Sequence, residues 1–211
     1  MYKNLKRKLN QRERVHCKAV SSNISLIATI IGNISPNELK NVIRKMQKRH
    51  PILNVHLESK GKDAFILANG SLEIPLKVID RKGAMQWREV IVKEHKIPFD
   101  MVNGPLIRFI LLCSPEISDL IIFCQHTICD GMSLAYLARD MMEYLANPSK
   151  EVELLPPPPI VNEESIPSDI KAKLSVRIFS KIINWMWEKN EVIFDYKDFE
   201  ELHKVFWENY T

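Results

Sequence analysis

The hydrophobic and polar positions of this 211-residue chain follow two periods, and each period predicts a different kind of element. Apolar residues three and four apart are typical of a helix with one buried face. This spacing predicts helices within 39–46, 87–91, 134–145 and 170–185. The first follows a capping box that begins at Ser35, and it must end before Pro51, because the residue that precedes a proline disfavours the helical conformation.

Strand patterns fill the intervals between these helices. Alternation and a high content of β-branched residues predict strands in 15–31 (with a break near 21–23), 51–59, 63–68 and 73–80. Residues 106–113 and 120–125 are apolar on both faces, so we expect them to be central strands covered on both sides. Hairpins beside longer helical crossovers predict an α/β protein of the α+β type, with a mixed sheet covered by helices.

Composition and charge indicate an ordinary globular protein and give no sign of nucleic-acid binding or of a transmembrane helix. The chain is 45% hydrophobic and 27% charged, as is ordinary for a globular protein, and its net charge of +4 gives no reason to expect nucleic-acid binding. No segment has the apolar length of a transmembrane helix. Residues 1–14 carry six Lys or Arg, but they lack interleaved aromatic residues and are interpreted as a solvated leader.

The four cysteines form no CxxC pair and are typical of reduced thiols in a cytoplasmic protein.

The segment 125–131, "QHTICDG", follows the apolar run 120–125 directly. A buried strand that ends in His126 is a rigid support for a side chain in a cleft. Spacing alone is equally consistent with a structural role, in which the histidine is a satisfied polar group and Asp130 caps the next helix. A metal site lacks a third ligand, and we expect no metal. A nucleophilic Cys129 lacks an activating feature beyond the histidine.

This segment resembles the H-H-x-x-x-D-G signature of the condensation-domain and CoA-dependent acyltransferase superfamily, which includes chloramphenicol acetyltransferase. Two more segments resemble that superfamily in the same order. "ELKNVIRKMQKRHPILNVHL" is similar to its early helix and "RHPxLR" strand, and "IPFDMVNGPLIRFILL" is similar to its "PFDLxxGPLxR" segment. The resemblance covers about residues 5 to 160 and implies one lobe of the two-lobed chloramphenicol acetyltransferase-like fold.

The resemblance also implies roles for the residues of the motif. His126 corresponds to the general base, which takes a proton from an acceptor amine or alcohol as that group attacks a thioester carbonyl. Asp130 is expected to be held by an arginine, for which Arg12 and Arg14 are the candidates. Gly131 is expected to permit a tight turn into the next helix and to keep the acyl or pantetheine channel open.

Gln125 departs from the motif, which has its first histidine at this position. Glutamine still donates and accepts hydrogen bonds but does not titrate. Because the first histidine of the motif is not the base, activity remains compatible with this replacement.

By the same resemblance the chain divides into three parts: a lobe at 1–147, a Pro-rich linker at 148–167, and crossover helices at 168–211 that lead toward a second lobe absent from this chain. The implied function is acyl transfer from acyl-CoA or a carrier-protein phosphopantetheine thioester to a hydroxyl or amine, with no tightly bound cofactor. The protein would be either a free-standing enzyme or a condensation domain of nonribosomal peptide synthesis. We expect the isolated 211-residue chain to be inactive and to self-associate. The alternative is a non-catalytic binding or interaction module that retains the fold.

Overall fold

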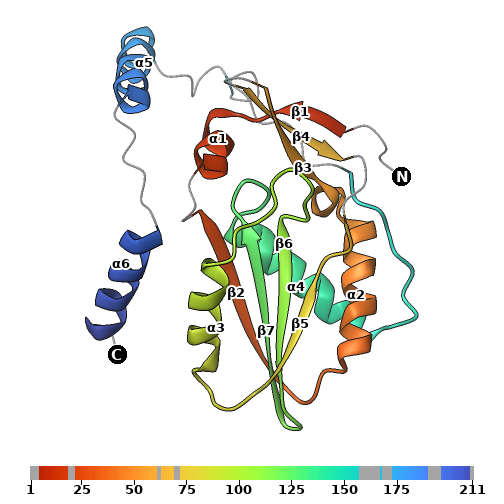
Figure 1. Ribbon diagram of the computed structural model, residues 1–211. Helices are drawn as coiled ribbons and strands as arrows, with labels where there is room; N and C mark the ends of the chain where they lie inside the picture. Colours follow the sequence, from red (N-terminus) through yellow and green to blue (C-terminus); the bar gives the residue numbers. More distant parts are fainter. Residues whose placement is uncertain are drawn as a thin grey trace.

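The computed structural model describes residues 5–18, 22–60, 63–68, 72–156, 167, 173–189 and 196–209, and within them the chain forms two sheets with helices packed around them (Figure 1). In chain order the elements are β1 (Leu5–Lys8), α1 (Gln11–Lys18), β2 (Asn23–Ile31), α2 (Pro36–Arg49), the 3₁₀ helix η1 (Pro51–Asn54), β3 (His56–Lys60), β4 (Asp63–Ala68), β5 (Leu76–Asp80), α3 (Gln86–His95), β6 (Ile107–Cys113), β7 (Ile117–Gln125), α4 (Gly131–Ala146), α5 (Leu174–Lys189) and α6 (Tyr196–Asn209).

The larger sheet has the strand order β2-β7-β6-β5, in which β5 and β6 are parallel and the other pairs are antiparallel. The two runs that are apolar on both faces form its central strands, β6 and β7. Their buried side chains include Ile110 and Leu111 on opposite faces, exposed by 1% and 0%. The predicted mixed sheet with covered central strands is therefore confirmed.

Helices cover both faces of this sheet, and the pattern of buried residues explains which helix covers which face. On one face, Val90 and Ile91 of α3 pack against Ile110 and Phe123. Helices α2 and α4 cover the other face (Figure 1). Their apolar stripes join the opposite side chains of β6 and β7 in the main core. This three-layer arrangement fixes the end of β7, from which the 125–131 segment emerges.

The N-terminal segment is part of the fold, so the interpretation of residues 1–14 as a solvated leader is wrong for the described residues. β1 pairs with β4 at the edge of a smaller antiparallel sheet with the order β1-β4-β3, and Leu9 is buried. α1 replaces the beginning of the strand predicted over 15–31. A reciprocal capping box explains the helix: Asn10 Oδ1 accepts from the Glu13 amide at 2.9 Å, and a Glu13 carboxylate oxygen accepts from the Asn10 amide at 2.8 Å.

The "GPL" segment before β6 brings two backbones together. Gly104 has a φ of +64°, and a Cβ there would lie 3.0 Å from the Val55 carbonyl oxygen, so only glycine fits without strain. Two residues later, the carbonyl of Leu106 accepts a 2.9 Å hydrogen bond from the Gln125 amide. The segment therefore supports the last residue of β7.

Helices α5 and α6 lie in the segment expected to cross toward a second lobe (Figure 1). The apolar spacing within 170–185 predicts a helix that packs one face and exposes the other, but every described side chain of α5 is exposed, so the predicted packing is wrong for the described residues. Glu200 of α6 forms an ion pair of 2.6 Å with Lys96, the residue that follows α3. Much of the expected linker, 157–166, lies outside the described residues. Among the helices that are described, none has the length and hydropathy needed to cross a membrane.

Candidate active site

The structure places His126 in the loop between β7 and α4, at the end of the buried strand. Its side chain is half-buried. Its amide donates a 2.9 Å hydrogen bond to the carbonyl of Ser22, next to the start of β2. Because Asn23 pairs with Gln125 in the sheet, the position of His126 is fixed by two neighbouring strands rather than by its loop alone.

A second histidine, which the sequence analysis missed, lies against His126. The His16 ring of α1 is stacked on the His126 ring, with centroids 4.1 Å apart and planes inclined by 15°. His16 Nδ1 is 3.0 Å from Ser22 Oγ, so Ser22 contacts both histidines, one through its hydroxyl and the other through its carbonyl. Burial, and then the charge of His126, lower the pKa of His16. Sequence spacing gives no signal for this pair, because His16 lies in the segment 15–31, whose pattern predicts a strand rather than the end of α1.

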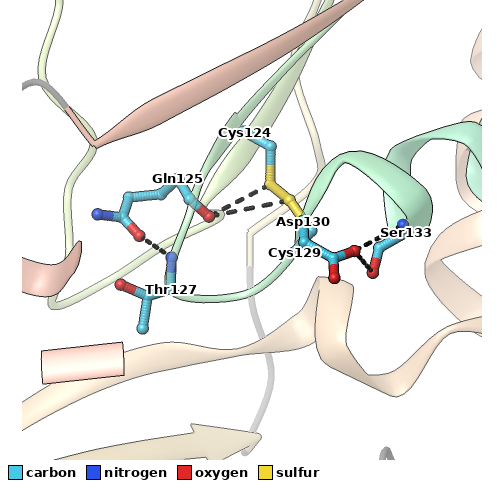
Figure 2. Close-up of a disulfide and its surroundings, with 6 residues drawn as sticks. All are labelled: Cys124, Gln125, Thr127, Cys129, Asp130 and Ser133. Atoms are coloured by element: carbon cyan, nitrogen blue, oxygen red, sulfur yellow. Dashed lines mark hydrogen bonds between the residues drawn. A yellow bond between two sulfur atoms is a disulfide. The ribbon is translucent and has the colours of Figure 1, made fainter. Parts of the chain in front are cut away.

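Gln125 connects the loop to α1. Its side chain is 4% exposed, its Nε2 donates to the His16 carbonyl at 2.7 Å, and its Oε1 accepts from the Thr127 amide (Figure 2). An amide side chain has both a donor and an acceptor end, and both are used here. The replacement of the motif's first histidine therefore leaves a fully hydrogen-bonded residue that holds the two flanks of His126 together.

Asp130 caps α4. Its Oδ1 accepts from the Ser133 amide at 2.8 Å and from Ser133 Oγ at 2.6 Å (Figure 2). These hydrogen bonds lower the pKa of the Asp130 carboxyl. Among the described side chains Asp130 forms no ion pair with an arginine, and the side chain of Arg12 lies outside the description. Asp130 is exposed and needs no counter-ion, which explains the difference.

Gly131 is the first residue of α4, so the expectation of a backbone turn that only glycine can make is wrong. The positive-φ glycines among the described residues are Gly32 and Gly104. A Cβ added at Gly131 would meet no atom within 4 Å. A role in keeping a channel open stays a prediction.

The interpretation of all four cysteines as reduced thiols is wrong for one pair. Cys124 and Cys129 form a disulfide across the loop that carries His126 (Figure 2). Cys113 is a free thiol. The two cysteines are five positions apart, one near the end of β7 and the other in the loop before α4, and this spacing gives no signal of a disulfide in the sequence. Among the described residues no cluster of three His, Cys, Asp or Glu side chains is placed to hold a metal ion.

The other two motif segments contribute buried ion pairs that support the site. Arg49, at the end of α2, lies 2.9 Å from Asp140 of α4. Arg108 of β6 lies 2.8 Å from Glu94 of α3, with its guanidinium over the ring of Phe123. Both carboxylates are less than 5% exposed. Each also has a second basic neighbour, Arg139 beside Asp140 and Lys77 beside Glu94, so removal of either arginine would weaken the charge compensation of a buried carboxylate.

A comparison with protein families gives a match to the condensation domain over residues 10–161. The chain belongs to the condensation-domain family. Among curated proteins it is 26% identical over 140 residues to bacitracin synthase 1 of Bacillus licheniformis, which covers 62% of this chain and 3% of that protein. It is also 26% identical over 147 residues to the phosphinothricin tripeptide synthetase PhsC of Streptomyces viridochromogenes, covering 65% of this chain and 13% of that protein. The family is one of acyl-transferring condensation enzymes.

Solved structures agree on the fold. The starter condensation domain of rhizomide synthetase RzmA is similar at 14% identity with a TM-score of 0.56, over 67% of this chain and 37% of that one. Polyketide synthase associated protein 5 from Mycobacterium tuberculosis is similar at 19% identity with a TM-score of 0.51, over 72% and 36%. The fold is thus the chloramphenicol acetyltransferase-like fold of condensation domains. This condensation-domain chain spans well under half the length of these solved relatives.

Proposed function

We propose that this chain is the His126-bearing lobe of an acyltransferase that moves an acyl group from a phosphopantetheine or CoA thioester to an amine or hydroxyl. The observation that carries the proposal is the support of His126. It follows a buried central strand, its amide is bound by Ser22, and its two flanks are joined by the side chain of Gln125. A half-buried imidazole on such a support has the properties of a general base.

His126 would act in two steps, attack of the acceptor on the thioester and loss of the thiol. The imidazole takes the proton of the acceptor N–H or O–H while the acceptor's lone pair forms a bond to the thioester carbonyl carbon. The tetrahedral intermediate then breaks its C–S bond, and the thiolate leaves with the proton that the imidazole returns. Asp130 acts indirectly, because it fixes the start of α4 and with it the end of the loop. We expect no tightly bound cofactor.

The identity of the residue at position 125 does not argue against activity. Gln125 performs a structural task for which titration is unnecessary, since both of its hydrogen bonds are to backbone groups. We therefore favour an enzyme over a non-catalytic module that only keeps the fold. The partners are a second lobe and, where the donor is a phosphopantetheine thioester, a carrier protein. A free-standing enzyme and a synthetase domain would share the same step.

The test uses the full reading frame that contains these residues, expressed whole, with octanoyl-CoA and octanoyl-pantetheine as donors and a small amine or alcohol as acceptor. We expect acceptor-dependent thiol release, and His126→Ala should reduce it by about 10²- to 10⁴-fold, as for loss of a general base. His56→Ala, at a histidine of β3 in the other sheet, is the matched control and should retain activity.

The 211-residue chain alone should show no release above thioester hydrolysis, because a general base cannot act on a donor that is not positioned. Activity of the whole protein that survives His126→Ala would reject this histidine as the base. A whole protein that binds acyl thioesters but never transfers them would support the non-catalytic module.

A further inference from the structure

Helix α5 carries apolar residues around more than half of its circumference. This follows from the positions of its apolar residues and from the period of about 3.6 residues per turn. The apolar face includes Ile178, Phe179, Ile182, Ile183, Trp185 and Met186, and all of these side chains are exposed. Figure 1 shows α5 clear of both sheets. The acyl-transfer step described above makes no use of this helix.

Basic residues occupy the remaining side of α5. Lys173, Arg177 and Lys181 follow one another at steps of four, which places them on one side of a helix. The Arg177 amide donates a 3.1 Å hydrogen bond to the Lys173 carbonyl, so the helical turn already includes Lys173. Residues 173–189 contain four Lys or Arg and one Glu. The helix therefore combines a wide apolar face with a narrow basic one.

Helix α6 is also amphipathic, but its charges have the opposite sign. It contains four Asp or Glu against two Lys, and its Glu200 is paired with Lys96 at 2.6 Å. An anionic surface would repel this helix. The basic character thus belongs to α5 specifically, and α6 offers a matched comparison within the same chain.

The width of the apolar face and the sign of the charges fit a lipid surface better than a protein groove. A helix that packs on a protein needs a narrower apolar stripe, whereas a helix in the plane of a membrane combines a broad apolar face with Lys and Arg. Lys189 Nζ lies 4.1 Å from the centroid of the Trp185 ring, and tryptophan is enriched at membrane–water interfaces. The 16 residues of α5 span about 24 Å, less than the about 30 Å of the hydrocarbon core, so the helix would lie along the surface.

We infer that α5 binds the chain to membrane surfaces that contain anionic phospholipids. The apolar face lies among the acyl chains, and Lys173, Arg177 and Lys181 lie at the level of the phosphate groups. This inference goes beyond the reaction proposed for His126 and does not depend on it. Association between copies of the chain would use the same apolar side chains, so anionic lipid should compete with association.

The experiment is flotation of the 211-residue chain with vesicles of phosphatidylcholine and phosphatidylglycerol in equal parts, and with vesicles of phosphatidylcholine alone. We expect binding to the anionic vesicles to be at least about tenfold stronger, and to weaken as salt rises from about 0.05 to about 0.5 M. Tryptophan emission should shift to shorter wavelength on binding, because Trp185 moves from water into the lipid interface.

Two pairs of substitutions test the basic side of the helix. Arg177→Gln with Lys181→Gln should weaken binding to the anionic vesicles about thirtyfold, because each basic residue near such a surface contributes separately. Lys197→Gln with Lys204→Gln removes the same charge from α6 and should leave binding unchanged. Equal losses from the two pairs would overturn the inference, because net charge rather than α5 would then cause the attraction.

A third pair tests the apolar side. Phe179→Ser with Ile182→Ser should weaken binding at least about tenfold, whereas Val102→Ser, at an exposed loop residue, should not. Because these side chains are exposed, the variants should unfold in urea as the wild type does, which shows that the fold is intact.

The remaining outcomes separate a membrane from other occupants of this surface. Absence of binding to either kind of vesicle would overturn the inference, and oligomers that persist beside the vesicles without floating would make α5 an interface between copies. Binding by the 211-residue chain that is lost in the full reading frame would assign α5 to a contact within the protein and would also overturn it. His126→Ala should float as the wild type does. Vesicle binding by a whole protein that transfers no acyl group would remove the proposed reaction alone.

Discussion

The ring of His16 lies flat against the ring of His126, with 4.1 Å between the two centroids. The contact joins α1, near the N-terminus, to the loop after the central strand β7. Ser22 contacts His16 through its hydroxyl and His126 through its carbonyl, so the two histidines share one support. Gln125 occupies the position of the motif's first histidine, but because His16 stacks on His126 the site still contains two imidazoles.

The stacked pair makes the pKa of His16 a measure of its neighbour. Burial lowers this pKa first, and the charge of His126 lowers it further. In His126→Phe a flat ring keeps the burial but removes the charge, so the pKa of His16 should rise; in His126→Ala water also enters, and it should rise more. NMR titration of the histidine ring protons measures both. His50, whose pKa is set by burial and by Asp140, is the internal control. An unchanged His16 titration in both variants would refute the pairing.

Gln125 should be important for stability, because both ends of its buried amide are used. Gln125→Leu leaves the Thr127 amide and the His16 carbonyl without partners, and each unsatisfied group costs about 1 to 3 kcal/mol. We expect urea titration to show a total loss of about 2 to 6 kcal/mol. Gln86 is the matched control: its amide also makes two hydrogen bonds to backbone groups, but these are exposed. Equal losses of unfolding free energy for Gln125→Leu and Gln86→Leu would contradict a stabilising role for the two buried hydrogen bonds of Gln125.

Asp130 should behave as a helix cap rather than as half of an ion pair. Asp130→Ala removes the acceptor of both Ser133 hydrogen bonds and should cost about 1 kcal/mol of unfolding free energy, as caps do. Asp130→Asn keeps a capping oxygen and should cost less than the alanine variant. A buried pair with Arg12 would instead make both variants cost about 3 to 5 kcal/mol. Chemical denaturation of the two variants separates these outcomes.

Elements whose burial is decided locally could be predicted from the sequence. The apolar runs of β6 and β7 need cover on both faces wherever they lie, and they are the central strands. The Ser35 capping box defines the start of α2, and its side chain does cap that helix. The basic composition of 1–14 predicts a solvated leader and the pattern of 15–31 predicts a strand, whereas the Asn10–Glu13 capping box starts a helix that spans the boundary between the two.

The candidate site was predicted only in part, because its neighbours come from distant segments. The position of His126 at a strand end follows from sequence, but the approach of His16 depends on how α1 packs after the sheet has formed. The family resemblance predicts an arginine partner for Asp130. In the structure, Ser133, three residues away, donates two hydrogen bonds to its carboxylate. The alternative that spacing alone left open, a helix cap, describes its observed contacts.

The exposed apolar side chains of α5 should cause the chain to associate. Phe179 and Ile182 are 63% and 51% exposed, and apolar patches of this kind promote contact between molecules. We expect sedimentation velocity to show species larger than the monomer as the concentration rises, and Phe179→Ser with Ile182→Ser to restore the monomer. Val102→Ser, at a residue 68% exposed in a loop, is the control and should not affect association. Monomers at every concentration would reject this surface as an interface.

His95 should make the chain sensitive to acid. It is 8% exposed, and burial, followed by the charges of His203 and Arg108, lowers its pKa to about 4. The unfolded chain has the ordinary histidine pKa of about 6.5, so between these values it binds the proton that the folded chain refuses. The unfolding free energy should therefore be fully present above about pH 6.5 and fall as the pH drops toward about 4, by up to about 3 kcal/mol. His95→Phe keeps the edge-on contact with Phe123 but does not titrate. Urea titrations at about pH 7 and about pH 4.5 should thus show a smaller acid loss in the variant than in the wild type, and equal losses would assign the acid sensitivity to other groups.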